Sequence, residues 1–234
     1  MAKTKATGAK AEDVAVLKAV YADTPIVIDG KLDDAVWAKA PAYAMTLSGE
    51  QHQQGKHVSE GGAVRFAWNE DFFYLGVDFT DSDVVAEGTA DGQHHYQLGD
   101  LAELFLWAED HPWYWELYVT PAGRQTTFFF PGAGRLGLPS GFQHHFWLQV
   151  AAQVDGTLND WRDRDRGWTA EMAVPVSELI RPGGSFGPGS RWRVLVGRYN
   201  YSVHLPAREL SMCPTMPQGN FHLRPSYGRI EFVR

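Results

Sequence analysis

The sequence predicts an all-β fold, a two-sheet antiparallel sandwich of the jelly-roll or immunoglobulin-like kind with two short helices. Three observations lead to this prediction. From Ile26 onward, apolar and polar residues alternate over about ten short runs, as in strands with one buried face. Clusters of Gly, Pro, Asn and Asp separate the runs at spacings typical of hairpins and meanders. Glycine and proline are frequent, at 24 and 13 of 234 residues.

The elements of the first half follow from local patterns. Residues 1–20 are rich in Ala, Lys and Thr and lack a strong apolar period, so we expect a flexible leader before a single domain over 21–234. A helix is predicted over 33–40, where Asp33 can cap the first turn and Pro41 ends the helix. Alternation then predicts strands at 63–68, 72–79, 101–107 and 113–119.

The second half continues in the same way. A second short helix is predicted over 176–180, directly after Pro175. The predicted strands of this half are 124–130, 145–154, 167–174, 191–201 and 228–233. Turns rich in Gly and Pro join them, which favours antiparallel neighbours in a sandwich.

Charge and cysteine content exclude several classes of function. The chain has 28 acidic and 21 basic residues, a net charge of −7, and no long Lys/Arg stripe, so neither nucleic acid nor an anionic membrane surface is an expected partner. The single cysteine, Cys213, excludes a disulfide scaffold and a Cys-rich zinc site. No apolar run approaches the ~20 residues that span a bilayer. The first residues lack the apolar stretch of a signal peptide, so we expect a soluble, cytoplasmic protein as written, or an extracytoplasmic one if a signal was removed.

A set of motifs resembles the family 9 carbohydrate-binding modules. The opening segment, IDGKLDDAVW at 28–37, has the family's strand, turn and short Trp-bearing helix. Further matching segments occur in the same order at 64–68, 74–77, 100–106, 118–123, 167–175 and 227–232. The resemblance covers 25–234 and implies an antiparallel sandwich related to the DOMON-like group, which includes sugar-binding and b-haem-binding members. It implies a non-catalytic module that binds a saccharide or polyol.

The resemblance also implies where a sugar would bind. In sugar-binding members two Trp side chains clamp a sugar ring, and these positions fall at Tyr96 and Met212, whose thioether offers less flat area than an indole. Polar family positions fall at Glu103, Arg198 and Asn200. The alternative is a purely structural role, in which Glu103 ends a strand and pairs with Arg198 across the sheet. The expected pocket is lined by Tyr96, Glu103, Tyr118, Arg198, Asn200 and Met212.

Bound ions or haem are further expectations. The resemblance implies structural calcium, for which Asp78, Asp81 and Asp83 offer hard oxygen ligands. The pairs His94-His95 and His144-His145 suggest a transition-metal site, against the alternative of solvated loop histidines. Met212 with His94 or His95 would make an axial pair for b-type haem, against the alternative that Met212 is a pocket wall.

An enzymatic alternative stays open at this point. Glu103, Glu116, Asp100 and the histidines offer an acid/base set that would suit a glycosidase, a cyclase or an isomerase in the same pocket. The sequence has no P-loop, GxSxG or HExxH motif. We therefore expect a binding module rather than an enzyme.

Overall fold

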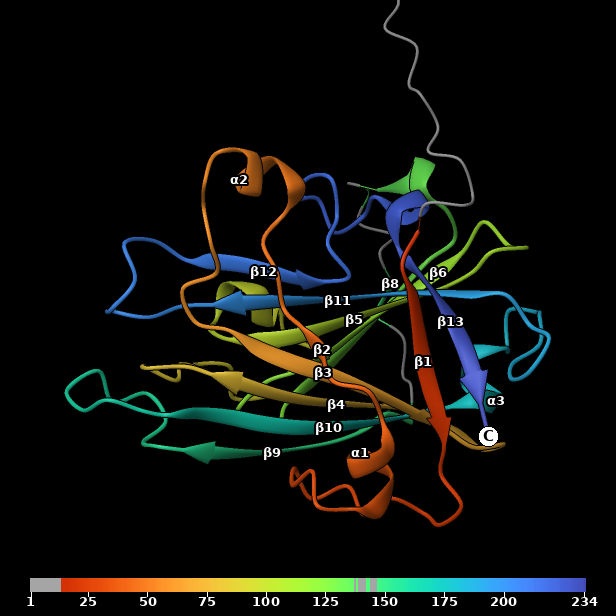
Figure 1. Ribbon diagram of the computed structural model, residues 1–234, viewed down its shortest axis with the longest axis horizontal. Helices are drawn as coiled ribbons and strands as arrows, with labels where there is room; N and C mark the ends of the chain where they lie inside the picture. The colour runs from red at the N-terminus through yellow and green to blue at the C-terminus, as the bar shows by residue number, and fades with distance from the viewer. Residues whose placement is uncertain (1–13, 137, 139–141, 144–146) are drawn as a thin grey trace, which may run out of the picture.

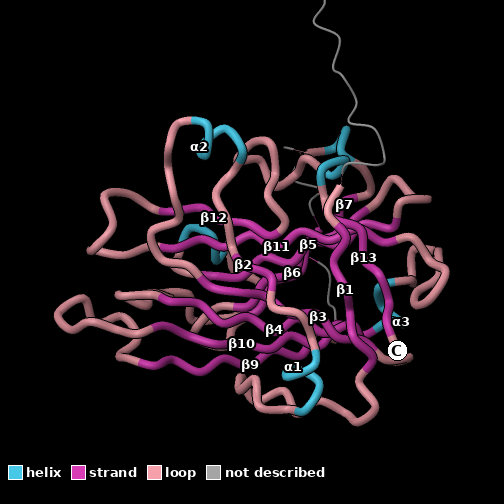
Figure 2. The backbone as a smooth tube through the Cα atoms, viewed as in Figure 1, coloured by secondary structure: helices cyan, strands magenta, loops and turns pink. Residues whose placement is uncertain are grey.

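The computed structural model describes residues 14–136, 138, 142–143 and 147–234. Strands dominate this part of the chain, with a few short helices at its periphery (Figure 2). The predicted all-β class is confirmed. The strands are β1 (Val16–Tyr21), β2 (Tyr43–Ala44), β3 (Gly62–Trp68), β4 (Phe72–Thr80), β5 (Leu101–Ala108), β6 (Tyr114–Val119), β7 (Gln125–Phe130), β8 (Phe142–Gln143), β9 (Gln149–Asp155), β10 (Gly167–Pro175), β11 (Trp192–Asn200), β12 (Glu209–Cys213) and β13 (Gly228–Val233).

Hydrogen bonding joins the described strands into one curled sheet, in the order β8-β7-β6-β5-β11-β13-β1-β3-β4-β10-β9. The expected division into two separate sheets is therefore not seen in the pairing. The reason is β1, which pairs in parallel with β13 on one edge and with β3 on the other. Strands β1 and β13 thus cross from one layer of the fold to the other (Figure 1).

The main core lies between the two layers of this curled sheet. Leu104 of β5 and Val196 of β11 belong to the same buried cluster as Phe66 of β3, Leu75 of β4 and Met172 of β10. Each comes from an alternating run, so one face of every strand is buried here, as the period of two requires. The opposite faces of the strands remain available for other contacts.

The predicted flexible leader, residues 1–20, extends too far along the chain, because its last residues form part of a strand. Residues 16–20 belong to β1, and Leu17 and Ala19 are buried in the core. Buried Leu17 and Ala19 alternate with exposed Val16 and Lys18, but an alternation this short is too weak a signal to recognise in the sequence. Pairing on both edges decides their conformation instead.

Two of the three α-helices were expected. Helix α1 (Ala35–Lys39) places Trp37 against the sheet, where its indole N–H donates to Glu171 Oε1 at 2.8 Å. Its N-cap is Asp34 rather than Asp33, and Asp34 Oδ2 accepts a bond from the Val27 N–H. Helix α3 (Val176–Leu179) follows Pro175. Helix α2 (Gly49–Gln53) was not predicted, although Ser48 and Gln51 form a capping box at its start.

None of the helices in the described residues is long and apolar enough to cross a membrane.

Candidate functional site

A second apolar layer covers the outer face, which we define as the face of β5, β6, β11 and β12 that points away from the main core. Antiparallel register places Glu103 opposite Tyr118 and opposite Gly197, and Gly197 opposite Met212. Residues that pair across strands point to the same face, as do residues two apart along a strand. The side chains on the outer face are Glu103, Phe105, Tyr114, Glu116, Tyr118, Leu195, Tyr199, Leu210 and Met212.

Two carboxyl groups, Glu103 and Glu116, are buried on this face and are called the acid pair below. Their exposed fractions are 3% and 4%. The hydroxyl of Tyr118 donates to Glu116 Oε1. In contrast, Glu103 Oε2 and Glu116 Oε2 are buried and have no hydrogen-bond partner within the described part of the chain. Such unpaired acceptors are uncommon in folded proteins.

Burial and mutual repulsion keep protons on the acid pair. Burial raises the pKa of Glu103 well above its ordinary value, and the negative charge of Glu116 raises it further. Burial also raises the pKa of Glu116, to about 7, against the opposing effect of the Tyr118 hydroxyl. Two neighbouring carboxyl groups in a medium of low polarity cannot both ionise without a compensating cation.

Aromatic rings surround the acid pair on the solvent side. The ring of Tyr118 contacts Phe128, with centroids 5.5 Å apart. Half-buried Tyr96 and Tyr199 contact each other at a centroid distance of 6.0 Å with a tilt of 53°. Both rings pack against the cluster that contains Tyr118. The outer face thus combines flat apolar rings with carboxyl oxygens.

Arg208 adds a cation at the edge of these rings. Its guanidinium lies 5.0 Å from the centroid of Tyr199 and donates to the Tyr201 hydroxyl at 2.9 Å. The Tyr201 hydroxyl in turn donates to the main-chain oxygen of Tyr96 at 2.7 Å. These bonds hold the loop that carries Tyr96 to the loop that follows β11.

His222 lies between the acid pair and solvent. Its Nε2 atom is 3.9 Å from Glu116 Oε2, and its side chain is 32% exposed. Its Nδ1 atom is 3.0 Å from the Tyr114 hydroxyl oxygen. Burial lowers the pKa of His222, which favours the neutral imidazole.

The structure places three of the predicted site residues together and separates two others from them. Tyr96, Glu103 and Tyr118 lie on or beside the outer face. Arg198 is opposite Ala102 and Ser211 in the sheet, and this register directs it into the other face, together with Asn200. The prediction that Arg198 and Asn200 share a pocket with Glu103 is wrong, because successive side chains of a strand point to opposite faces.

Arg198 has a structural set of partners instead. It is fully buried and donates to the carbonyl oxygens of Glu60, Gly61 and Thr80 and to Asp81 Oδ2, the last at 3.0 Å. Asn200 donates from Nδ2 to Glu60 Oε2 at 2.8 Å. Arg198 therefore does not pair with Glu103, and that alternative prediction is wrong as well.

Met212 is on the outer face but is sealed within it. Its exposed fraction is 0%, it belongs to a cluster with Phe105, Met216 and Tyr227, and its sulfur accepts a bond from the Met216 N–H at 3.4 Å. A side chain covered in this way offers no surface for stacking on a sugar. The same burial removes Met212 as an axial partner for His94 or His95, so these residues do not fit b-type haem.

The expected calcium ligands do not converge. Asp78 is exposed on β4, whereas Asp81 binds Arg198 and Asp83 Oδ2 accepts from the Val203 N–H at 2.7 Å. Across residues 14–136, 138, 142–143 and 147–234, no group of three or more His, Cys, Asp or Glu side chains is arranged to hold a metal ion. The three aspartates therefore do not fit a shared calcium ion. The pair His144-His145 lies outside the described residues.

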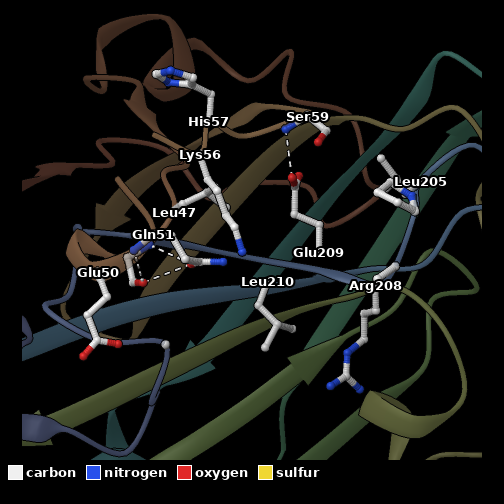
Figure 3. A pocket seen from close by; sticks show the side chains of 14 residues that line it. Leu47, Glu50, Gln51, Lys56, His57, Ser59, Leu205, Arg208, Glu209 and Leu210 are labelled. Carbon is white, nitrogen blue, oxygen red and sulfur yellow. Dashed lines mark hydrogen bonds between the residues drawn. The ribbon is translucent and has the colours of Figure 1, made fainter. Parts of the chain in front are cut away.

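A polar groove runs beside the edge of β12 (Figure 3). Its volume is about 610 Å³, and Lys56, Ser59, Arg208, Glu209 and Leu210 are among the residues that line it. Glu209 points toward Ser59 and accepts a bond from its N–H at 2.9 Å, whereas Arg208 and Leu210 point to the other side, toward the outer face. Arg208 therefore connects the groove with Tyr199.

Sequence reasoning missed Tyr199, Tyr201 and Arg208. Tyr199 and Tyr201 are inside the predicted strand 191–201, but no role was predicted for either. Alternation alone does not say which face is open to ligand. Arg208 carried no signal, because a lone arginine in a loop is ordinarily solvated.

Comparisons with known proteins point to one family. The model of the family described as carbohydrate family 9 binding domain-like matches residues 28–186. Among curated proteins, no relative matches the sequence. A proposed carbohydrate-binding protein of Bacteroides uniformis is similar in structure, with a TM-score of 0.68 and 13% identity over 93% of this chain and 99% of that one.

A family 9 module of Caldicellulosiruptor kristjanssonii is similar as well. In its complex with cellotriose the TM-score is 0.61 at 15% identity, over 93% of each chain. In its complex with glucose the TM-score is 0.58 at 14% identity, over 94% of this chain and 96% of that chain. At these identities the structural similarity shows a shared fold.

Proposed function

The chain belongs to the carbohydrate family 9 binding domain-like family, and on that premise we propose that it is a non-catalytic module that binds a saccharide on its outer face. The observation that carries the proposal is the contact between half-buried Tyr96 and Tyr199 on the outer face, with the guanidinium of Arg208 at the edge of Tyr199. Aromatic rings pack against the C–H faces of a sugar, and polar side chains at their edge bind its hydroxyl groups.

Tyr96 and Tyr199 serve as the stacking platform in this proposal. Because their rings already contact each other, a sugar ring lies over them rather than between them. Arg208, at the edge of Tyr199, supplies N–H donors for the hydroxyl oxygens of the sugar. Tyr199 takes the role that the sequence had assigned to Met212.

The groove beside β12 gives room for a longer ligand. Arg208 lines the groove and also contacts Tyr199, so a chain of sugars bound at Tyr199 can continue into it. Its volume of about 610 Å³ is within the range of small-molecule sites, ~300–1,000 Å³. Since the Caldicellulosiruptor module was solved with glucose and with cellotriose, glucose and short gluco-oligosaccharides are the first ligands to test.

The state of the acid pair supports binding rather than hydrolysis. A glycosidase of the usual kind holds its two carboxyl groups at least ~5 Å apart on either side of the scissile bond. Glu103 and Glu116 instead interact with each other by hydrogen bonding and are covered by side chains. This arrangement differs from two carboxyl groups that flank a scissile bond.

Isothermal titration calorimetry tests the proposal. The chain is titrated with glucose, cellobiose, cellotriose and xylo-oligosaccharides, and the ligand is recovered afterwards and checked by chromatography. We expect saturable binding of at least one of these ligands and its recovery unchanged. The absence of heat with all of them at millimolar concentration overturns sugar binding, and a cleaved or isomerised ligand overturns the non-catalytic role.

A further inference from the structure

The acid pair leaves two oxygen atoms without a donor in the interior. Glu103 Oε2 and Glu116 Oε2 are both buried, and neither has a hydrogen-bond partner among residues 14–136, 138, 142–143 and 147–234. An unpaired buried acceptor destabilises a folded chain, and more so when it is charged. Two such atoms on neighbouring side chains indicate a site that becomes satisfied when something else binds.

The chemistry of the pair specifies the missing group. When the carboxyl groups are ionised, both atoms are acceptors, so a partner that binds the ionised pair must donate hydrogen bonds. The two carboxyl groups repel each other when ionised, so the partner should also carry positive charge. An ammonium group meets both requirements, because it has three N–H donors and a full charge.

The surroundings favour an organic cation over a metal ion. Within the described ranges no third carboxylate, histidine or cysteine completes a metal-binding group with the pair. The neighbouring groups are aromatic instead, with Tyr118 opposite Glu103 and Phe128 against Tyr118. Aromatic faces stabilise ammonium groups through their ring quadrupoles.

His222 borders the acid pair on its solvent side. This residue is the partly exposed neighbour of Glu116 and is held by the hydroxyl of Tyr114 rather than by a strand ladder. It lies in the segment between β12 and β13, outside both strands. The His222 ring, which also packs against Phe105 and Phe130, is therefore the side chain that a ligand must displace to reach Glu116 from this side.

We propose that the outer face recognises a sugar that bears a free amino group, with the ammonium bound between Glu103 and Glu116 and the sugar ring against the neighbouring tyrosines. This inference rests on the proposed saccharide-binding function and narrows its ligand to amino sugars. The protonated amine replaces the proton that the two acids otherwise share. N-acetylation removes both the charge and two of the three donors, so an N-acetyl sugar lacks this interaction.

Calorimetry with matched sugars tests the inference. The intact chain is titrated at pH 7 with glucosamine, glucose and N-acetylglucosamine, which differ only at carbon 2. We expect glucosamine to bind at least tenfold more tightly than glucose, and N-acetylglucosamine to bind no better than glucose. The comparison needs no variant and is independent of any folding defect.

Two variants test whether the acid pair causes the preference for glucosamine over glucose. Glu116→Gln and Glu103→Gln keep the shape of the side chain and remove its charge, and each should reduce the ratio of glucosamine to glucose affinity to near one. Glu231→Gln, at an exposed position on β13, is the matched control and should keep the ratio of the unmodified chain. Circular dichroism verifies that each variant is folded.

The possible results separate this inference from the proposed function. If glucose or a gluco-oligosaccharide binds and glucosamine binds no more tightly, the inference is wrong and the saccharide-binding function stands. If a preference for glucosamine persists unchanged in both glutamine variants, the acid pair is not the amine site. If no sugar binds at all, the proposed function itself fails.

Discussion

The carboxyl group of Glu103 and the guanidinium of Arg198 point to opposite faces of one sheet, although they belong to adjacent strands. Glu103 pairs with Gly197, and the next residue, Arg198, pairs with Ala102. Glu103 therefore belongs to the outer face, and Arg198 contacts the carbonyl groups and Asp81 on the inner side. This separation gives Arg198 a structural role and leaves Glu103 on the face where we propose that a saccharide binds.

Arg198→Met should destabilise the fold strongly. The change removes a buried cation from three carbonyl oxygens and leaves the buried carboxyl group of Asp81 without its partner. Breaking a buried ion pair in this way costs about 3–5 kcal/mol. Urea denaturation at pH 7 measures the loss of unfolding free energy. Arg208→Met, at an exposed arginine, is the control and should cost less than about 1 kcal/mol. Equal stabilities for the two variants would refute the structural role of Arg198.

Glu116→Gln should change how stability depends on pH. Because the pKa of Glu116 is about 7 in the folded chain and its ordinary value is 4.5, the native state keeps a proton that the unfolded state has released between these values. The free energy of unfolding therefore falls as pH rises from about 4.5 to 7. The glutamine does not titrate, so the variant should not lose stability in this way. Relative to the unmodified chain, its free energy of unfolding should rise by on the order of 3 kcal/mol between pH 4.5 and pH 7.

Denaturation curves at pH 5, 6, 7 and 8 test this prediction. The pKa of His222 is lowered and that of Asp81 is raised to about 6, but both groups are present in both proteins, so the difference between the two curves isolates the acid pair. Parallel curves for the two proteins would show that Glu116 titrates normally.

Tyr199→Ala should weaken saccharide binding. The variant removes one ring of the stacking pair and the surface against which Arg208 packs. An aromatic contact of this kind contributes ~0.5–1.5 kcal/mol beyond area burial, so a two- to tenfold increase in Kd is expected, relative to the unmodified chain in calorimetry. Tyr199→Phe keeps the ring and should retain most of the affinity. If Trp161→Ala, at an exposed tryptophan outside this face, has the same effect as Tyr199→Ala, the stacking platform has been misplaced.

Met212→Trp should destabilise the chain without tightening sugar binding. The side chain of Met212 fills a closed space beside Phe105 and Tyr227. A larger indole there overpacks the core at a cost of about 1–3 kcal/mol. Thermal unfolding and calorimetry with the best ligand measure the two effects. Tighter binding at unchanged stability would show that Met212 reaches the ligand after all.

Much of the fold could be predicted from local sequence. Alternation over 63–68, 72–79, 113–119 and 167–174 predicted strands that the structure contains as β3, β4, β6 and β10. Residues 35–39 form the helix expected before Pro41. These signals are local, because the period of the apolar residues and the turn chemistry act over a few neighbouring positions.

The positions of the site residues depended on information that is not local. The family positions of Tyr96 and Glu103 and the aromatic run that contains Tyr118 could be read from the sequence, and these three residues do lie near one another. The same resemblance predicted a place in the pocket for Met212, Arg198 and Asn200. What these side chains contact is decided instead by the strand register and by the residues that pack over them. Met212 is closed in by a cluster that includes Met216 and Phe221, and a single step along β11 turns Arg198 away from Glu103.

The sequence by itself determined the strands with clear alternation, the two expected helices, the acidic charge balance and the family motifs, but it did not indicate β1, β2 or β12. Tertiary structure alone decided that β1 joins the two layers, that Arg198 is a buried structural cation, and that Glu103 and Glu116 meet beneath aromatic rings. The physical reason is that strand propensity depends on neighbours in the chain, whereas pairing register sets which face each side chain takes. Burial and pKa values then follow from what the rest of the fold places over that face.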